Sequence, residues 1–239
     1  MQIAIPLKGL RIGLIALFLC QSQLSIAQYH EVGPFLGASN YRGDVGPSYF
    51  LYPNSPAFGI VYKWNITTRY SLRFSAINST LIGSDYKAND LNRFSRAYRF
   101  KNNVSEVSLG VEINFVDFNL HTGTPDFSPY IFLGLSYVDY NLFYFNGPPP
   151  AEQIEYDGEQ KMAIPIVVGF KTNPSPLVVL GFEVGLRYAL TDNLDGNTPV
   201  EEFDFARYGD FTNNDWYIFS GLTISFTFGD LPCYCKEKR

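Results

Sequence analysis

The chain has 239 residues, with 18 Lys and Arg against 23 Asp and Glu, and its formal net charge is −5. An acidic chain is repelled by a phosphate backbone, which argues against a nucleic-acid-binding protein. The 21 Phe, 17 Tyr and 20 Gly favour β-strands separated by turns, and after the first 27 residues no apolar run approaches the roughly 18 residues of a transmembrane helix.

The first 27 residues have the pattern of a secretory signal peptide, which is removed from the mature protein. Lys8 and Arg11 precede the apolar run IGLIALFLC, and small residues at Ser25 and Ala27 come just before Gln28. The alternative is a lipoprotein signal cut before Cys20, but bulky Leu19 stands where that site needs a small residue. We expect a signal peptide over 1–27, one domain over 28–229 and a tail over 230–239.

Eight segments of the mature chain alternate apolar and polar residues with a period of two, which is typical of β-strands with one apolar face. In the last segment, Trp216, Ile218 and Leu222 share one face and Thr223 and Ser225 the other. The segments cover 30–41, 57–66, 69–81, 104–117, 128–140, 162–172, 177–190 and 215–229.

The polar faces carry charges of both signs, together with Gly and Ser. Strands of ten or more residues with unbroken apolar faces match the roughly 9–11 residues that a tilted strand needs to cross a bilayer. In a membrane barrel the apolar face contacts lipid, and interior charges compensate each other. We therefore predict an all-β, eight-stranded antiparallel outer-membrane β-barrel with an interior ion-pair network of Glu31, Lys63, Arg69, Arg73, Glu106, Glu112, Lys171, Glu183 and Arg187.

A secreted soluble β-barrel, with its apolar faces turned inward, is the structural alternative. The connections favour the membrane barrel because short turns alternate with long loops, as in outer-membrane barrels. The turns at 67–68 and 173–176 are tight and 118–127 is intermediate, whereas 42–56, 82–103, 141–161 and 191–214 are long. An even strand number then places both termini, and the tail, in the periplasm.

Aromatic residues mark two further features. Those near the strand ends suit the interface girdles of a membrane barrel, and they are Trp64, Tyr70, Tyr188, Trp216 and Phe228. The loops also contain aromatic stretches, YNLFYFNGPPP and EEFDFARYGDF. These stretches form either a binding surface or a rim packed on itself, and both interpretations stay open.

The sequence gives little indication of a catalytic or metal site. Neither His30 nor His121 has a second His or a Cys at ligand spacing, and no His stands near the outer rim, where a lipid hydrolase would need it. Glu106 and Glu112 lie about 20 Å apart on one strand face, too far to act on one bond, and we expect them to pair with Arg69 and Arg73. About eight strands leave an interior filled by side chains. We predict no catalytic residues, no metal, no cofactor and no small-molecule substrate.

The tail contains Cys233 and Cys235, separated only by Tyr234. A disulfide between them would close a very small, strained ring, because alternate side chains of an extended backbone point to opposite sides. Cysteines left unpaired in an oxidising compartment suggest a disulfide to another chain or a metal. Without a nearby His the disulfide to a partner is the sharper hypothesis, and two idle cysteines or a strained local bridge are the alternative.

Several stretches resemble the PorG family, small outer-membrane barrels of the type IX secretion and gliding machinery of Bacteroidota. They are HEVGPFLGASNYRGD, VSEVSLGVEINF with SPYIFLGLSY, LRYALTDNLDG, and NNDWYIFSGLTISFTFG before the Cys-bearing tail, so the resemblance spans nearly the whole mature chain. Two features depart from it: Thr191-Asp192-Asn193-Leu194-Asp195-Gly196 lacks a second Asp after Asp195, and Pro232 precedes Cys233 where the family has Cys before Pro. Which cysteine matches the family's stays open.

The resemblance implies a non-enzymatic role in the outer membrane, in contact with lipid and with a periplasmic ring of a PorK-type lipoprotein and a PorN-type protein. A disulfide from Cys233 or Cys235 to the ring lipoprotein would fit that role. The alternatives are a free-standing OmpX- or OmpW-like barrel in adhesion, defence or small-solute passage, and an outer-membrane enzyme acting on lipid, against which the missing rim His argues.

Overall fold

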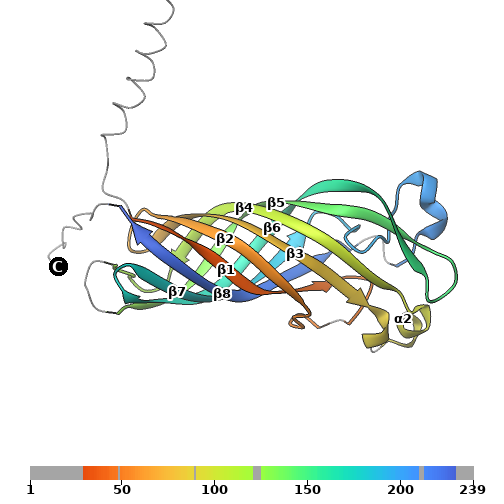
Figure 1. Cartoon of the computed structure of the whole chain (residues 1–239), viewed down its shortest axis with the longest axis horizontal. Coiled ribbons are helices and arrows are strands. Elements are labelled where there is room, and N and C mark those ends of the chain that lie inside the picture. The colour runs from red at the N-terminus through yellow and green to blue at the C-terminus, as the bar shows by residue number, and fades with distance from the viewer. Residues whose placement is uncertain (1–28, 48, 89, 121–124, 210–212, 230–239) are drawn as a thin grey trace, which may run out of the picture.

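The computed structural model describes residues 29–47, 49–88, 90–120, 125–209 and 213–229. They form one closed antiparallel barrel in which each strand pairs with its sequence neighbours and the last strand pairs with the first (Figure 1). The strands are β1 (Tyr29–Arg42), β2 (Ser55–Asn65), β3 (Tyr70–Ser84), β4 (Arg99–Asn114), β5 (Phe127–Asn146), β6 (Glu152–Ser175), β7 (Val178–Ala189) and β8 (Trp216–Phe228). The predicted eight-stranded fold is confirmed.

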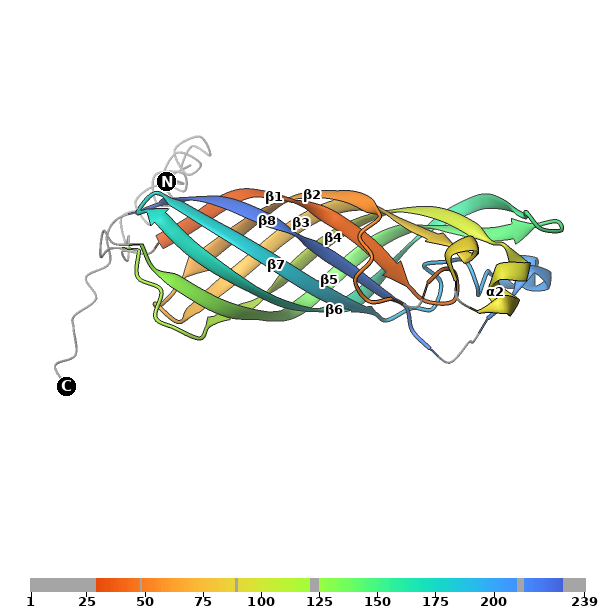
Figure 2. The same ribbon diagram turned by 90° about the horizontal axis from the view of Figure 1, so that it is seen from below.

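Short and long connections lie at opposite ends of the barrel (Figures 1 and 2). At the short-turn end, β1 begins, β8 ends, and the turns at 66–69, 115–126 and 176–177 join strands. At the loop end, the connections are 43–54, 85–98, 147–151 and 190–215. Three of the four loop-end connections are long, as predicted, and both described termini of the barrel lie at the short-turn end.

The helical elements are short and belong to the loop end. They are η2 (Asp85–Lys87), α2 (Leu91–Arg96) and η3 (Glu201–Ala206). The Asp90 carboxylate caps α2 by accepting hydrogen bonds from the backbone N–H groups of Asn92 and Arg93, and Ala97 ends it in the left-handed conformation. In the part of the chain that the structure describes, no helix has the length and apolarity to cross a membrane.

One predicted loop is wrong. We expected a long loop over 141–161, but β5 continues to Asn146 and β6 begins at Glu152, so that only 147–151 connect them. The two strands stay paired through this region, with a register shift at Leu142 and Phe143. The extension is stable because Phe143 and Phe145 are buried and stack against Phe100 and Tyr98, respectively. The resulting hairpin protrudes well beyond the barrel wall (Figure 1).

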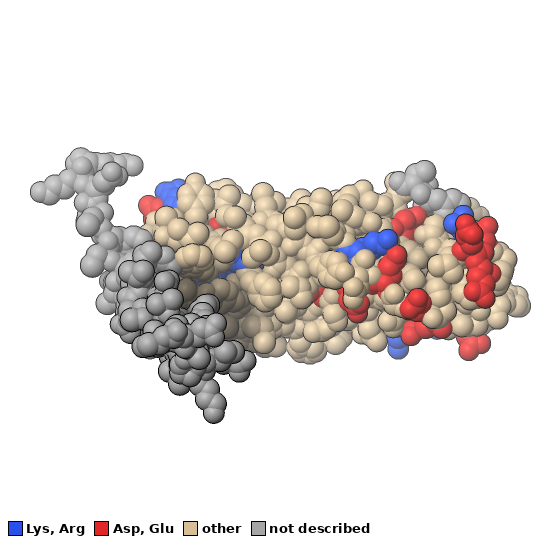
Figure 3. All heavy atoms as spheres, turned by 90° about the horizontal axis from the view of Figure 1, so that it is seen from above, with Lys and Arg blue, Asp and Glu red and all other residues tan. Residues whose placement is uncertain are grey.

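The apolar faces of the strands point outward. Ile60, Leu109 and Leu222 are 53–60% exposed, whereas the residues between outward positions are buried. On the face shown in Figure 3, charged side chains are sparse over the middle of the barrel and carboxylates gather at the loop end. An apolar belt around a closed barrel is the surface that a bilayer covers, and a soluble barrel would have the opposite arrangement. The chain is therefore a transmembrane barrel of the outer-membrane type.

Candidate functional site

The barrel interior holds a group of charged side chains centred on Glu112. The Lys63 Nζ lies 2.9 and 2.8 Å from the two Glu112 carboxylate oxygens, and the Lys171 Nζ lies 2.7 Å from Oε1. A third cation, Arg73, comes within 3.5 Å of Oε2. All four side chains are at most 2% exposed. One carboxylate from β4 thus holds together cations from β2, β3 and β6.

Arg73 continues the network to the opposite wall. Its Nη1 and Nη2 donate to the two Glu183 carboxylate oxygens over 2.8 and 2.7 Å, the paired geometry that a guanidinium favours. The Tyr130 hydroxyl donates to the same carboxylate over 2.6 Å. Arg73 therefore bridges Glu112 and Glu183 and ties β3, β4, β5 and β7 across the lumen.

A second group lies closer to the loop end. The Arg187 Nε is 3.3 Å from a Glu106 carboxylate oxygen, and the Tyr217 hydroxyl donates to Glu106 over 2.6 Å. Phe219 lies beneath the Arg187 guanidinium, whose Cζ is 4.5 Å from the ring centroid. Interior residue Glu31 makes no ion pair among the described residues and instead accepts a hydrogen bond from the Asn65 amide.

Apolar layers close the network at both ends. At the short-turn end Phe118, Leu120 and Val179 form a buried cluster, with the Lys171 Nζ 4.8 Å from the Phe118 ring centroid. Towards the loop end a larger buried cluster includes Phe100 and Phe143. Apart from Glu31, the interior charges are thus paired with one another, and all of them are separated from water, which is the arrangement of a structural core rather than of a solute path.

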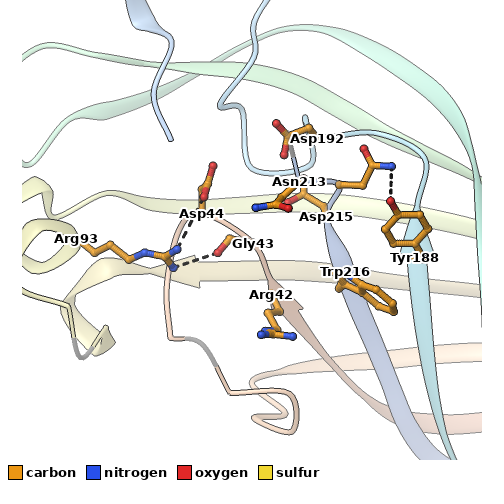
Figure 4. Close-up of a pocket in the computed structure, with 10 residues that line it drawn as sticks. Arg42, Gly43, Asp44, Arg93, Tyr188, Asp192, Asn213, Asp215 and Trp216 are labelled. Atoms are coloured by element: carbon orange, nitrogen blue, oxygen red, sulfur yellow. Dashed lines mark hydrogen bonds and ion pairs between the residues drawn. The ribbon is translucent and has the colours of Figure 1, made fainter. Parts of the chain in front are cut away.

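A pocket of about 340 Å³ opens at the loop end (Figure 4). Its walls come from the end of β1, the end of β7, the start of β8, α2 and the β7–β8 loop. Arg93 of α2 donates to the Gly43 and Gly46 carbonyl oxygens over 3.1 Å and lies 3.8 Å from Asp44. On the opposite wall, the Tyr188 and Trp216 ring centroids are 4.9 Å apart. The pocket combines both charge signs with an aromatic pair.

Buried carboxyl groups behind the pocket join the β1–β2 loop to the β7–β8 loop. Asp195 accepts hydrogen bonds from the backbone N–H groups of Asp44 and Val45 over 3.1 and 3.2 Å. Asp215 accepts from the Leu194 N–H over 2.9 Å and from the Tyr41 hydroxyl. The two loops are therefore connected through side-chain carboxyl groups.

Burial is the main cause of the unusual electrostatics of these two acids. It raises the pKa of Asp195 to about 7, to which the charge of Asp44 contributes. Burial and the charge of Asp195 raise the pKa of Asp215 well above its ordinary value. Space here is tight, because a Cβ at Gly43 would lie 1.7 Å from the Tyr41 hydroxyl oxygen. Sequence reasoning missed this cluster, although Asp44 and Asp195 stand in the stretches HEVGPFLGASNYRGD and LRYALTDNLDG.

A family described as "Domain of unknown function (DUF6089)" matches residues 11–237 of the chain. The chain belongs to this family. No curated protein sequence matches the chain.

Solved structures similar to this DUF6089 protein are small outer-membrane proteins. The N-terminal β-barrel domain of Pseudomonas aeruginosa OprF is 14% identical with a TM-score of 0.44, covering 85% of this chain and 99% of that one. Neisserial surface protein A is 12% identical with a TM-score of 0.42, and the match covers 84% of this chain and 97% of that one. The third is the attachment invasion locus protein Ail of Yersinia pestis, solved in complex with the heparin analogue sucrose octasulfate. It is 11% identical with a TM-score of 0.41, and the match covers 84% of this chain and 97% of that one.

The predicted interior ion-pair network of the DUF6089 barrel needs two corrections. Glu31 is buried inside the barrel but makes no ion pair among the described residues. Arg69 lies outside the lumen, 49% exposed, because it belongs to the tight turn before β3, and its Nε is 2.5 Å from the exposed Asp117 carboxylate. The pairing of Arg69 with Glu106 or Glu112 is therefore wrong: Glu106 pairs with Arg187 from β7, and Glu112 with the three cations described above. Cys233, Cys235, His121 and the predicted signal peptide lie outside the described residues.

The position of Arg69 leads to a simple prediction. Arg69→Ala removes an ion pair that water already screens, and such pairs contribute little to stability. We expect the urea midpoint for unfolding of the barrel in lipid vesicles to stay at the wild-type value within error. A clear fall in the midpoint would mean that Arg69 belongs to the structural network after all.

Proposed function

We propose that this DUF6089 protein is a non-enzymatic, free-standing outer-membrane barrel that works through its loop end as a surface protein in adhesion or defence. The observation that carries the proposal is the closed interior. Glu112 and Glu183 are paired with buried cations, and apolar clusters lie on both sides of them. A barrel closed in this way offers its loops, rather than its lumen, for contact with other molecules.

The protruding hairpin supplies a surface suited to such contacts. Tyr144 of β5 stacks on Phe203 of η3 with ring centroids 4.4 Å apart, and Phe205 beside them is 74% exposed. Glu201 and Glu202 of η3 are also exposed. Exposed aromatic side chains held in place by a rigid support are typical of protein-binding surfaces. The loop aromatics therefore combine both interpretations, since Phe143 and Phe145 pack into the core while Phe205 faces solvent.

Conductance measurements test the closed interior. The purified full-length protein inserted into planar lipid bilayers should give no stable current steps under conditions in which a trimeric porin conducts. The physical reason is the dry, ion-paired layer around Arg73 and Glu112, both at most 1% exposed. Reproducible conductance of the wild-type protein would contradict the proposal and favour small-solute passage.

Labelling of intact cells tests which end faces outward. In a background with Cys233→Ser and Cys235→Ser, a membrane-impermeant maleimide should label Glu202→Cys at the loop end. Asp117→Cys, which is exposed at the short-turn end, should stay unlabelled until the cells are lysed. The reverse pattern would place the loop end in the periplasm and contradict the surface role.

A second candidate function is suggested by the short-turn end of the barrel. β8 ends at Phe228, at the short-turn end, and the cysteine-bearing tail follows it in the sequence. In the proposed orientation this end faces the periplasm, which supports a role as a type IX secretion component that contacts a PorK-type ring lipoprotein and a PorN-type protein.

Non-reducing electrophoresis separates the two candidates. A secretion component tied by a disulfide should run as a larger species that disappears on reduction and in a Cys233→Ala, Cys235→Ala variant. Deletion of the protein should also abolish secretion of cargo proteins. A free-standing barrel would show neither the larger species nor the secretion defect.

A further inference from the structure

The pocket at the loop end lies on the outer wall of the barrel. Tyr188, Trp216 and Arg42 belong to the adjacent strands β7, β8 and β1, and Trp216 pairs with each of the other two. Their sequence neighbours Arg187 and Tyr217 are buried inside the barrel. Because side chains alternate along a strand, Tyr188, Trp216 and Arg42 point away from the lumen. Three of the residues that line the pocket therefore face the membrane side of the wall (Figure 4).

The pocket also lies at the height of the lipid headgroups. Phe228 and Trp216 are the two ends of β8. A strand that rises about 3.3 Å per residue and tilts by about 40° separates these two residues by about 30 Å along the barrel axis, against an apolar band about 25 Å tall. If Phe228 marks one edge of the apolar band, Trp216 lies at the other edge, where hydrocarbon meets headgroups.

The neighbouring β1–β2 loop has the character of a membrane interface. Tyr49, Phe50 and Leu51 are 45–60% exposed. The loop is held against the outer wall, because the Asn40 amide donates to the Phe50 carbonyl oxygen over 2.9 Å. Exposed aromatic and aliphatic side chains on such a loop suit the boundary between acyl chains and headgroups. The loop therefore places side chains suited to lipid contact beside the pocket.

The charges of the pocket favour a neutral, hydroxyl-rich ligand. Two cations, Arg42 and Arg93, stand against the carboxyl groups of Asp44, Asp192 and Asp215, and burial raises the pKa of Asp215, which disfavours its charged form. The remaining charges balance, so neither a phosphate nor a metal cation is favoured. Closely spaced donors and acceptors beside an aromatic pair match the hydroxyl groups and the apolar C–H face of a sugar ring.

One side chain is well placed to contact such a ligand. Within the described ranges Arg42 makes no ion pair, and its guanidinium Cζ lies 3.5 Å from the centroid of the Phe50 ring. The N–H groups of its planar guanidinium can donate hydrogen bonds to ligand oxygens. The volume of about 340 Å³ is at the lower end of the roughly 300–1,000 Å³ of small-ligand sites, which suits a small headgroup.

We propose that this pocket binds the sugar headgroup of a glycolipid in the outer leaflet of the membrane. Tyr188 and Trp216 contact the sugar ring, and Arg42 and Asp192 bind its hydroxyl groups. The outer leaflet follows from the proposed orientation of the loop end, which the Glu202→Cys labelling tests separately. Failure of glycolipid binding and failure of the surface orientation are therefore distinguishable.

Tryptophan fluorescence provides a direct test, because the chain has two Trp residues and only one lines the pocket. The Trp64→Phe variant of the full chain, folded in lauryldimethylamine oxide, reports on Trp216 alone. Titration with monogalactosyl diacylglycerol should give a saturable change in emission. Phosphatidylglycerol with the same acyl chains, and free methyl galactoside at the same concentrations, should give none.

Two variants in the Trp64→Phe background locate the binding site. Arg42→Gln should weaken glycolipid binding about tenfold, as expected for loss of a hydrogen bond from a charged group. Arg99→Gln is the matched control, since Arg99 also lies over an aromatic ring, Tyr86, but is outside the pocket, and it should bind like the parent. Heat-modifiable migration in electrophoresis shows that each variant is folded.

Four results would overturn the proposal. No emission change with monogalactosyl diacylglycerol would exclude the glycolipid. An equal response to phosphatidylglycerol would mean insertion of acyl chains without recognition of the sugar, and an equal response to methyl galactoside would assign the pocket to soluble sugars. Equal weakening by Arg42→Gln and Arg99→Gln would place binding outside the pocket.

Discussion

Replacing Glu112 with Gln is expected to lower the free energy of unfolding of the barrel by roughly 3–5 kcal/mol, the range for breaking a buried ion pair by removing one partner. Lys63 and Lys171 both lie within 3 Å of this carboxylate and are almost completely buried. Without Glu112 each must either stay charged in a dry environment or release its proton, and both options are costly. Urea unfolding in lipid vesicles, followed by fluorescence, measures the change.

Two further variants test this prediction more strictly. The double variant Glu112→Gln, Lys171→Met removes one of the unpaired charges and should recover part of the lost stability. Arg69→Ala, which removes a cation at the exposed turn, serves as the control without effect. If Glu112→Gln unfolds within about 1 kcal/mol of the wild type, the interior charges do not act as the structural core described here.

The second large effect concerns pH. The hydrogen-bonded junction between the β1–β2 and β7–β8 loops should become less stable as the pH rises from about 4 to about 7. The pKa of Asp195 is about 7 in the folded protein, against roughly 3.9 for an ordinary Asp. Between these values the folded state holds a proton that the unfolded state has released, so stabilisation is complete below about pH 4 and is lost towards pH 7. The raised pKa of Asp215 acts in the same direction.

Hydrogen exchange of residues 43–47 and 190–209, corrected for the intrinsic pH dependence of exchange, measures this effect. Protection should fall within the window by up to about tenfold per pH unit for each of the two carboxyl protons released. Backbone amides of β4 in the apolar belt should show no such trend. Protection that increases with pH would contradict the assignment of the raised pKa values.

A nearly isosteric variant identifies the responsible group. In Asp215→Asn the amide oxygen can accept from the Leu194 N–H and the amide nitrogen can donate to the Tyr41 hydroxyl, so the contacts of the wild-type carboxyl are kept. The carboxyl whose pKa is raised by burial and by the charge of Asp195 is then absent, and Asp195 is left as the titrating group of the junction. The pH dependence should become shallower, and protection at pH 8 should exceed that of the wild type. An unchanged slope would mean that Asp215 does not take part.

Much of the wall could be predicted from the sequence. The alternation over 215–229 is enough to place β8 and to separate Trp216 and Leu222, which face outward, from Tyr217 and Thr223, which face inward. The signal is reliable because successive side chains of a strand must point to opposite faces. The protruding part of β5 and β6 was missed, since its stability comes from Phe143 and Phe145 packing on a distant strand and loop rather than from a membrane-spanning pattern.

Strand periodicity is local, so the alternation of residues is enough to predict most of the charges that enter the barrel, and the exception is Arg69 in the turn before β3. Glu106, Glu112, Glu183 and their cations were all placed inside by the face on which they stand. The partners of these charges depend on the tertiary structure: Glu106 meets Arg187, 81 residues away, and the pocket forms where β1, β7 and β8 come together. Those contacts depend on the closure and stagger of the barrel, which bring distant strands to the same height and which no local pattern encodes.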